Sequence, residues 1–230
     1  RAVIWRTAYP RIAGYFEAET GQRLAAGIKI LAKVAVNYHE LYGFSLQITD
    51  IDPTYTLGDM ERQRQMTIAQ LQKEGVWDMN REAPMPVVVQ RVAVVSSANA
   101  AGYQDFRKEL AKSPYRFEVT LFDAFMQGAA AEESIVTALC AVAERMDEFD
   151  AVVLNRGGGS ASDLNCFNAY RLCAHVAQFP LPVVTGIGHD KDTSVADMVA
   201  HTALKTPTAV AGWLVERMAE TDGWLDCAAL

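Results

Sequence analysis

The sequence lacks the features of a disulfide-bonded or membrane-spanning protein. It contains only four cysteines in 230 residues, Cys140, Cys166, Cys173 and Cys227, and none forms a CxxC pair. Four thiols in a chain of this length do not make the dense framework of small secreted domains, so we expect a reducing, cytoplasmic setting. No apolar run approaches membrane-spanning length and no charged-then-apolar leader opens the chain, so we expect no membrane partner.

An excess of basic charge is also missing. The 21 Lys and Arg residues are outnumbered by 28 Asp and Glu residues, which gives a formal net charge of −7. This balance excludes a broadly basic nucleic-acid binder but leaves room for a local basic groove. Apolar residues make up 50% of the chain, enough for a sizeable core. We therefore expect one large or two small ordered domains, without low-complexity tracts or internal repeats.

Residues 1–54 are predicted to be β-like. After a short apolar run at Arg1–Trp5, the segments Gly27–Val36 and Phe44–Ile51 alternate apolar and polar residues, as half-buried strands do. Residues 37–43 between them are the predicted hairpin loop. Three strands are few for a closed sheet, and the chain opens in strand-like sequence without an initiator methionine. We therefore expect the first region to be part of a larger all-β domain.

Residues 55–88 are predicted to be a helical connector. Met60, Met66, Ile68 and Leu71 follow helical spacing within residues 59–74, and Gly75 is a plausible C′ stop. Two prolines at 84 and 86 then interrupt the chain before the next strand.

Residues 89–207 alternate between strand and helix patterns. The predicted strands are Val89–Val95, Phe117–Phe122, Phe149–Leu154 and Leu181–Ile187, and the predicted helices are Asp105–Leu110, Glu132–Met146 and Asn165–Gln178. Alternating βα units predict an α/β fold, an open parallel sheet with helices on both faces. Residues 208–230 are predicted to begin a C-terminal helical region.

The most informative feature is the loop that follows the predicted strand at 149–154. It reads Arg156-Gly157-Gly158-Gly159-Ser160. Consecutive glycines cost backbone entropy, and close approach of an anion to backbone N–H groups at a helix start is one reason to retain them. The preceding arginine adds a positively charged guanidinium group, whose paired N–H donors suit a phosphate. The alternatives are a plain tight turn and an arginine paired with a surface carboxylate.

Two other predicted strands end in comparable sequences. Ser96 and Ser97 follow the strand at 89–95, with Asp105 soon after, and Gly188, His189 and Asp192 follow the strand at 181–187. Because open parallel sheets bind ligands beyond the carboxyl ends of their strands, we expect all three strand ends to share one edge. This set of an arginine, a histidine, carboxylates, hydroxyls and glycines predicts a composite phosphate site.

Several of these residues have alternative interpretations. His189 is one of four histidines and a lone histidine is often structural, while Asp192 either orients its ring or caps a helix. Asp197 extends the pair to a metal-binding pattern, although no second histidine lies at ligand spacing. Aromatic residues in and beside the predicted hairpin loop either stack nucleic-acid bases or pack within the hairpin. They are Tyr38, Tyr42 and Phe44.

Taken together, four motifs resemble the exodeoxyribonuclease VII large-subunit family. They are Val94-Val95-Ser96-Ser97 with Asp105, the Arg156–Ser160 loop with Asp163-Leu164 and Phe167-Asn168, Gly188-His189-x-x-Asp192 with Asp197, and Thr206-Pro207-Thr208-Ala209. Their order and spacing match across about residues 87–212. Residues 67–86 also resemble the family's link between an OB-fold and the nuclease domain, so residues 1–54 would be a partial OB-fold-like nucleic-acid-binding region.

The resemblance implies an exonuclease that degrades single-stranded DNA from its ends to short oligonucleotides. It implies a catalytic role for Asp105, Arg156, His189 and Asp192. Phosphate or DNA binding is assigned to Ser96, Ser97, Gly157, Gly158, Gly159, Ser160, Lys205 and Thr206. No metal ligand or cofactor is required, with Mg²⁺ left as an alternative. The family's large subunit continues into a long helical region that binds several small subunits, and only the start of that region would lie in residues 208–230.

The sequence departs from the family pattern near the predicted site. Asn155 stands where the family usually has glycine before the arginine, and Asn165 or Cys166 replaces an expected aromatic residue. Ala203 replaces an expected arginine, with Lys205 nearby, and Gly212 replaces an expected acidic residue. The four central residues are intact. Two other functions fit the residues: a non-catalytic nucleotide- or phosphate-binding module, and a metal-dependent phosphohydrolase that uses Asp197.

Overall fold

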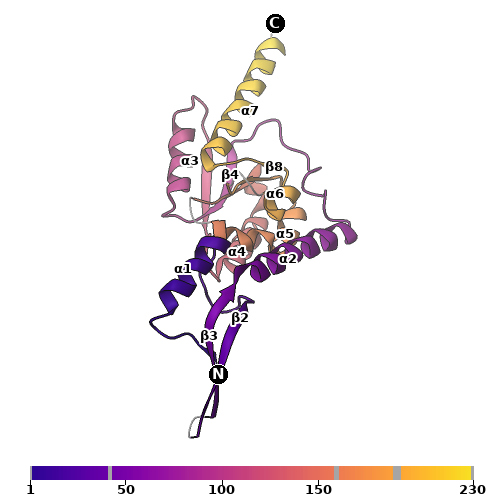
Figure 1. Ribbon diagram of the computed structural model, residues 1–230. Coiled ribbons are helices and arrows are strands. Elements are labelled where there is room, and N and C mark those ends of the chain that lie inside the picture. The colour runs from indigo at the N-terminus through magenta and orange to yellow at the C-terminus, as the bar shows by residue number, and fades with distance from the viewer. Residues whose placement is uncertain (1, 41–42, 158–160, 189–192, 229–230) are drawn as a thin grey trace. The chain divides into compact units, whose positions relative to one another are not determined.

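The computed structural model describes residues 2–40, 43–157, 161–188 and 193–228 (Figure 1). The chain divides into two compact units, one made mainly of residues 1–65 and the other of residues 66–159 and 163–230. Among the described residues, no helix has both the length and the apolar composition needed to cross a membrane.

The first unit combines a small mixed sheet with one helix. Strand β3 (Gly43–Asp52) lies between β1 (Ala2–Val3), which runs parallel to it, and β2 (Leu31–His39), which runs antiparallel. The register of β2 and β3 shifts at Lys33/Val34, where a β-bulge bends the pair. The predicted strands are thus present, but β2 begins at Leu31 rather than Gly27. It also continues to His39, so the connecting turn is shorter than the predicted loop of residues 37–43.

Helix α1 (Tyr9–Thr20) is a correction to the expected all-β character of this region. Pro10 stands in its first turn, and Gly21 ends it in the left-handed conformation with φ of 66°. Ile12 and Phe16 are one turn apart and pack with Ile51 of β3 in a small buried cluster. The helical signal of this segment is weak, because only Ile12, Phe16 and Thr20 are buried and they are separated by intervals of four residues.

Helix α2 (Pro53–Lys73) connects the sheet of the first unit to the second unit. It begins six residues earlier than predicted, because Pro53 starts it with a suitable φ and Asp52 Oδ1 accepts a hydrogen bond from the backbone N–H of Thr54, 2.9 Å away. Gly75, with φ of 73°, follows the helix as the predicted stop.

The second unit is built on a sheet of five parallel strands in the order β5-β4-β6-β7-β8. The strands are β4 (Arg91–Ser96), β5 (Glu118–Asp123), β6 (Ala151–Asn155), β7 (Val183–Gly186) and β8 (Thr202–Ala203). The α/β prediction is confirmed. Strand β8 was not predicted, because its two residues give no alternation to recognise.

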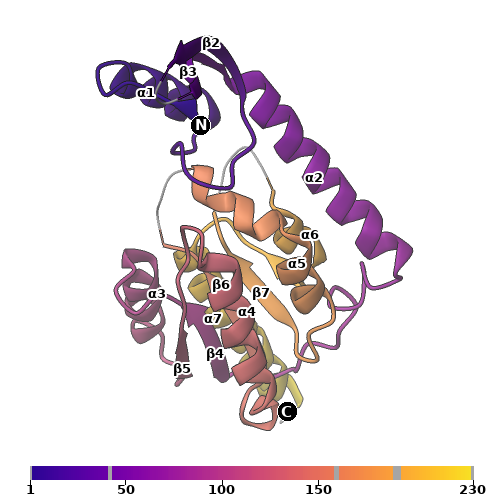
Figure 2. The same cartoon turned by 90° about the horizontal axis from the view of Figure 1, so that it is seen from below.

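Helices cover both faces of this sheet (Figure 2). The helices α4 (Ala131–Ala143), α5 (Tyr170–Ala177) and α6 (Val195–Val199) contribute to the core on one face, and α3 (Ala101–Ala111) and α7 (Pro207–Ala228) to the core on the other. The short 3₁₀ helices η1 (Met146–Glu148) and η2 (Ala161–Asn168) complete the order. The predicted helix over residues 165–178 is therefore divided into the end of η2 and the shorter α5.

Asn80 anchors the connector to the amino-terminal side of β7. Its fully buried side chain donates to the carbonyls of Phe179 and Leu181, and its Oδ1 accepts from the backbone N–H groups of Val183 and His201. All four hydrogen bonds are between 2.9 and 3.0 Å long. One side chain thus fixes three chain segments that are distant in sequence.

Candidate active site

The loops after β4 and β6 meet through their backbones at the carboxyl edge of the parallel sheet. A Cβ atom built on Gly102 would lie 2.7 Å from the Cα of Gly157, and one on Gly157 would lie 3.2 Å from the backbone N of Gly102. No side chain fits between two backbones at this distance. The first glycine of the Arg156–Ser160 loop is therefore needed for packing, in addition to any contact with an anion.

The end of β7 joins the same edge. Gly186 pairs with Asn155 in the β6–β7 register, and a Cβ on Gly186 would lie 2.4 Å from Asn155 Oδ1. Gly188 has φ of 75°, and a Cβ there would lie 2.8 Å from the carbonyl oxygen of Lys205. The segment that leads into α7 thus approaches the β7 loop. The sheet edge brings together three strand ends, as the sequence predicts, and it adds the start of α7, which the sequence analysis did not place there.

Arg156 lies within this convergence and is 4% exposed. Its backbone N–H donates to the carbonyl of Gly186 at 3.2 Å, which ties the start of the glycine loop to β7. Burial of a guanidinium is costly unless it is paired or hydrogen-bonded, so this side chain is held in place rather than free in solvent. Such a fixed, planar donor suits recognition of a phosphate.

Polar residues stand at the carboxyl ends of the neighbouring strands β4 and β6, and the one on β6 directly precedes Arg156. Ser96 and Asn155 are both fully buried at the ends of β4 and β6. Among the described residues, the Ser96 hydroxyl and both polar atoms of the Asn155 amide have no hydrogen-bond partner. Buried polar groups are usually satisfied, so these three atoms mark a place where the edge of the sheet is prepared for polar contacts. Ser97 is half-buried, and its carbonyl accepts from Ala100 N–H in the turn before α3.

Asp105 lies on the second turn of α3 and is more exposed than Arg156. Its carboxylate is 3.4 Å from Lys108 Nζ, and the two side chains are 54% and 74% exposed. An ion pair with this exposure contributes little to stability and is readily exchanged for another partner. The carboxylate is thus accessible to solvent rather than locked into the sheet edge.

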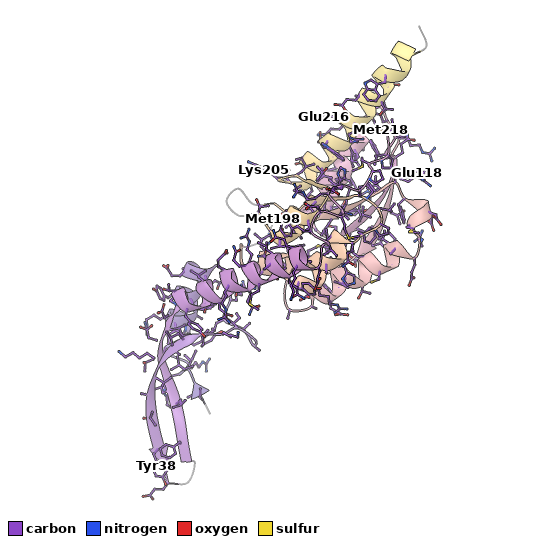
Figure 3. All side chains as sticks on the ribbon, turned by 90° about the vertical axis from the view of Figure 1, so that its right-hand side faces the viewer. Tyr38, Glu118, Met198, Lys205, Glu216 and Met218 are labelled. Carbon is purple, nitrogen blue, oxygen red and sulfur yellow. The ribbon has the colours of Figure 1, made fainter. Side chains whose placement is uncertain are left out.

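Lys205 and Thr206 precede α7 and are exposed. The hydroxyl of Thr206 accepts from the backbone N–H of Ala209 at 3.1 Å and lies 3.0 Å from the hydroxyl of Thr208, so it caps the helix. This N-terminus also carries the positive end of the helix dipole. Figure 3 labels Lys205 at this start of α7.

The remaining predicted site residues lie outside the described residues. They are Gly158, Gly159, Ser160, His189 and Asp192. Their assignments therefore stay predictions.

Asp197 has a structural role that accounts for both of its carboxylate oxygens. Oδ1 accepts from the Thr185 hydroxyl at 2.6 Å, and Oδ2 accepts from the backbone N–H and hydroxyl of Ser194. Ser194 and Asp197 form a capping box that starts α6 and ties it to β7. These bonds favour the cap over the metal-ligand interpretation of this residue.

Two residues that shape the site were not among the predicted site residues, although Asn168 belongs to one of the four motifs. Asp123, at the carboxyl end of β5, accepts from Ala98 N–H at 2.8 Å and supports the loop after β4. Asn168, at the end of η2, accepts from Val195 N–H at 2.9 Å and positions the start of α6. The strand-end rule that selected Ser96 and Arg156 would also have selected Asp123, had it been applied to the strand at 117–122.

The residues that differ from the expected family pattern are buried to different extents. Asn155 is buried in the sheet edge, whereas Ala203 is exposed on β8 and Gly212 is half-buried on α7. Asn155 is the departure that touches the site, because its amide occupies space left by Gly186.

Comparisons with known proteins converge on one family. The family model described as "Exonuclease VII, large subunit" matches residues 76–229. The chain is 38% identical over 220 residues to the exodeoxyribonuclease 7 large subunit of Deinococcus radiodurans, covering 94% of this chain and 53% of the relative. It is 33% identical over 221 residues to that of a Nostoc species, covering 96% and 51%. The chain spans about half the length of these curated relatives.

Proposed function

The chain belongs to the exonuclease VII large-subunit family, and from this premise we propose that it hydrolyses phosphodiester bonds of single-stranded DNA, releasing short oligonucleotides from DNA ends. The observation that carries the proposal is the convergence of three strand-end loops and the start of α7 around buried Arg156. A site that only binds phosphate would need a single loop. A nuclease needs groups on both sides of the scissile phosphate.

In the proposed mechanism, Arg156 and the backbone N–H groups of the glycine loop hold the phosphate and stabilise the charge that develops on its oxygens. His189 protonates the leaving oxygen or activates water, and Asp192 orients its ring. Asp105 assists water activation, since its exposed pair with Lys108 leaves the carboxylate free to exchange partners. Supporting contacts to the DNA backbone come from Ser97, Ser160, Lys205 and Thr206, whereas Ser96 is fully buried and would support this edge from within the sheet.

We assign the parts of the chain as the sequence divides them. Residues 89–207 form the nuclease domain, residues 55–88 the connector, and residues 208–230 the start of a helical region that docks the small subunit. Residues 1–54 form a partial OB-fold-like region that binds nucleic acid. Tyr38 and Phe44 support that role because they are 65% and 71% exposed, with ring centroids 5.0 Å apart (Figure 3). Exposed, adjacent rings suit base stacking.

A cytoplasmic location is part of the proposal. Among the described residues, Cys140, Cys166 and Cys173 form no disulfide bond, which supports a reducing compartment.

The proposed chemistry requires no cofactor, with Mg²⁺ as the alternative. A single-turnover assay of the intact protein on end-labelled single-stranded DNA, in excess chelator, decides between them. Full activity in chelator supports the metal-free mechanism, whereas activity that is lost and then restored by Mg²⁺ contradicts it.

The catalytic assignment is tested with His189→Ala in the intact protein. We expect a loss of 10²-fold or more in the single-turnover rate, the usual effect of removing a general acid or base, on the order of 10²–10⁴. His175→Ala on α5 is the matched control, since that ring contacts a backbone carbonyl of its own helix. Near-wild-type hydrolysis by His189→Ala would show that the assignment is wrong. DNA binding without hydrolysis in the unmodified protein would favour a phosphate-binding module.

A further inference from the structure

One side of α3, the edge strand β5 and the segment between them line a groove that the proposed mechanism does not use. Its volume is about 600 Å³. The lining residues that bear on its chemistry are Tyr103, Arg107, Tyr115, Arg116 and Phe117. Strand β5 is at the end of the five-stranded order, so the groove opens along a sheet edge.

The charge of the groove is opposite to that of the chain. Two arginines and no carboxylate line it, although the chain carries a net charge of −7. The guanidinium of Arg107 lies 5.9 Å from the centre of the Tyr103 ring. Arg116 is 87% exposed and lies 3.5 Å from Glu118, which is itself 61% exposed. An ion pair this exposed is easily replaced by a stronger anion. Both cations are thus accessible to phosphate.

Aromatic side chains alternate with these cations. Tyr115 and Phe117 are half-buried in the wall of the groove, and the hydroxyl of Tyr115 lies 3.4 Å from Asp222 of α7. Arginines interleaved with aromatic rings are the usual composition of surfaces that bind single-stranded nucleic acid, since the bases stack and the backbone is neutralised.

The direction of the groove connects it to the candidate active site. Tyr103 directly follows Gly102, whose backbone lies against Gly157, while Ala111 ends α3 at the opposite edge of the sheet. The eight helical steps from Tyr103 to Ala111 rise about 12 Å. A few nucleotides of extended single-stranded DNA span this length, because their phosphates lie farther apart than those along one strand of a duplex.

We propose that this groove binds a segment of single-stranded DNA that continues from the active site, through phosphate contacts to Arg107 and Arg116 and base stacking on Tyr115 and Phe117. The proposal rests on the proposed function for its substrate class. It adds a second DNA contact on the nuclease domain, separate from the strand-end loops.

The test measures DNA binding rather than hydrolysis, so that it stays informative if the proposed chemistry fails. Fluorescence anisotropy with a labelled 30-nucleotide oligo(dT) is recorded across a salt series in the intact protein carrying His189→Ala. Adding Arg107→Glu and Arg116→Glu is expected to weaken binding about tenfold or more. Loss of two phosphate contacts should also reduce the slope of log Kd against log salt by about 1.4.

The matched control carries the same charge change elsewhere. Lys73→Glu with Arg81→Glu alters two exposed cations outside the groove lining. We expect these to change Kd by less than twofold. Arg107→Lys with Arg116→Lys keeps the charge and should retain most of the affinity, which separates loss of charge from damage to α3.

Cross-linking gives an independent result. An oligonucleotide with 5-iodouracil is expected to cross-link to Tyr115 or Phe117 under ultraviolet light, as read by mass spectrometry. Equal binding by the groove and control variants, with no cross-link at either ring, would overturn the proposal. So would a change of oligomeric state without a change in DNA affinity, because the groove would then be an interface between proteins. If DNA binds in the groove but is not hydrolysed by the unmodified protein, only the proposed function fails.

Discussion

Asn155 occupies space that exists because Gly186 has no side chain. The two residues are partners in the β6–β7 register, and a Cβ on Gly186 would lie 2.4 Å from Asn155 Oδ1 and 2.8 Å from Val210 Cγ2. A glycine at position 155, which the resemblance gives as the usual residue of the family, would leave this space open. The asparagine in this chain therefore depends on the glycine opposite.

Gly186→Ala is expected to destabilise the protein by about 1–3 kcal/mol, the usual cost of overpacking a buried site. Asn155→Gly should relieve part of this cost by removing the Oδ1 contact, so the two substitutions should not be additive. Urea unfolding of both single variants and the double variant measures the coupling.

Gly212→Ala is the control for that cycle. A Cβ there would meet nothing within 4 Å, and the residue lies inside α7. The helix should gain up to about 1 kcal/mol from the better helix former. Strict additivity of Gly186→Ala and Asn155→Gly would contradict the proposed dependence.

Gly102→Ala is expected to lower activity more than stability. Its Cβ would lie 2.7 Å from a backbone atom, Gly157 Cα, which cannot turn away as a flexible side chain can. The loops after β4 and β6 would separate by a fraction of an ångström or more, and small displacements of positioning groups can reduce rates about 10²-fold. Single-turnover hydrolysis of labelled single-stranded DNA, together with the melting temperature, provides the comparison.

The control for Gly102 is Gly58→Ala in α2, where an added Cβ meets nothing within 4 Å. It should leave turnover unchanged. Equal rates for Gly102→Ala and Gly58→Ala would show that contact between the two loops is not needed for hydrolysis.

The sequence predicts the sheet edge that carries the candidate site better than it predicts the first unit, for physical reasons. Arg156 and Ser96 follow continuous apolar runs, and burial on both faces of a parallel sheet makes such strands easy to recognise. The carboxyl-edge rule then places their loops together without any knowledge of side-chain contacts. In contrast, α1 covers a small sheet with only Ile12 and Phe16 fully buried, so its apolar pattern is weak.

Contacts between residues that are distant in the sequence cannot be predicted from local sequence patterns. Nothing in the local sequence of Asn155 indicates that Gly186 leaves room for it, because the register of β6 and β7 depends on the whole sheet. The pairing of Asp105 with Lys108 was readable from their three-residue spacing on a helix. The groove beside Arg107 was not, since α3 and β5 meet only in the folded chain.

Asn80→Ala is expected to destabilise the second unit by several kcal/mol. The substitution leaves two buried N–H groups and two carbonyls without their partners, and each unsatisfied group costs about 1–3 kcal/mol before any water enters. Asn165→Ala, at an exposed position of η2, should change the unfolding free energy by less than about 0.5 kcal/mol. Chemical denaturation of both variants is the measurement, and similar midpoints would contradict the anchoring role of Asn80.

The ion pair between Asp150 and Arg91 should make the stability of the fold depend on pH in the acidic range. Burial raises the pKa of Asp150, but hydrogen bonds from the Arg91 guanidinium and from the backbone N–H groups of Arg91 and Gln90 outweigh it, so the pKa lies below its ordinary value. A carboxyl with a lowered folded-state pKa stabilises the fold above its unfolded pKa, about 3.9. That stabilisation is lost as pH falls below about 4 and through the folded-state pKa.

Asp150→Asn should therefore lower the melting temperature at pH 7 and have a smaller effect as the pH falls toward 2.5, because a growing fraction of the wild-type carboxyl is then protonated. Arg91→Ala removes the cation and should flatten the same part of the pH profile, because the carboxyl then keeps less of its preference for the charged form. Thermal melts from pH 2.5 to 7 measure both variants. A constant difference between wild type and Asp150→Asn across that range would show that the asparagine loses packing or hydrogen bonds only, and that the charge of Asp150 does not stabilise the fold.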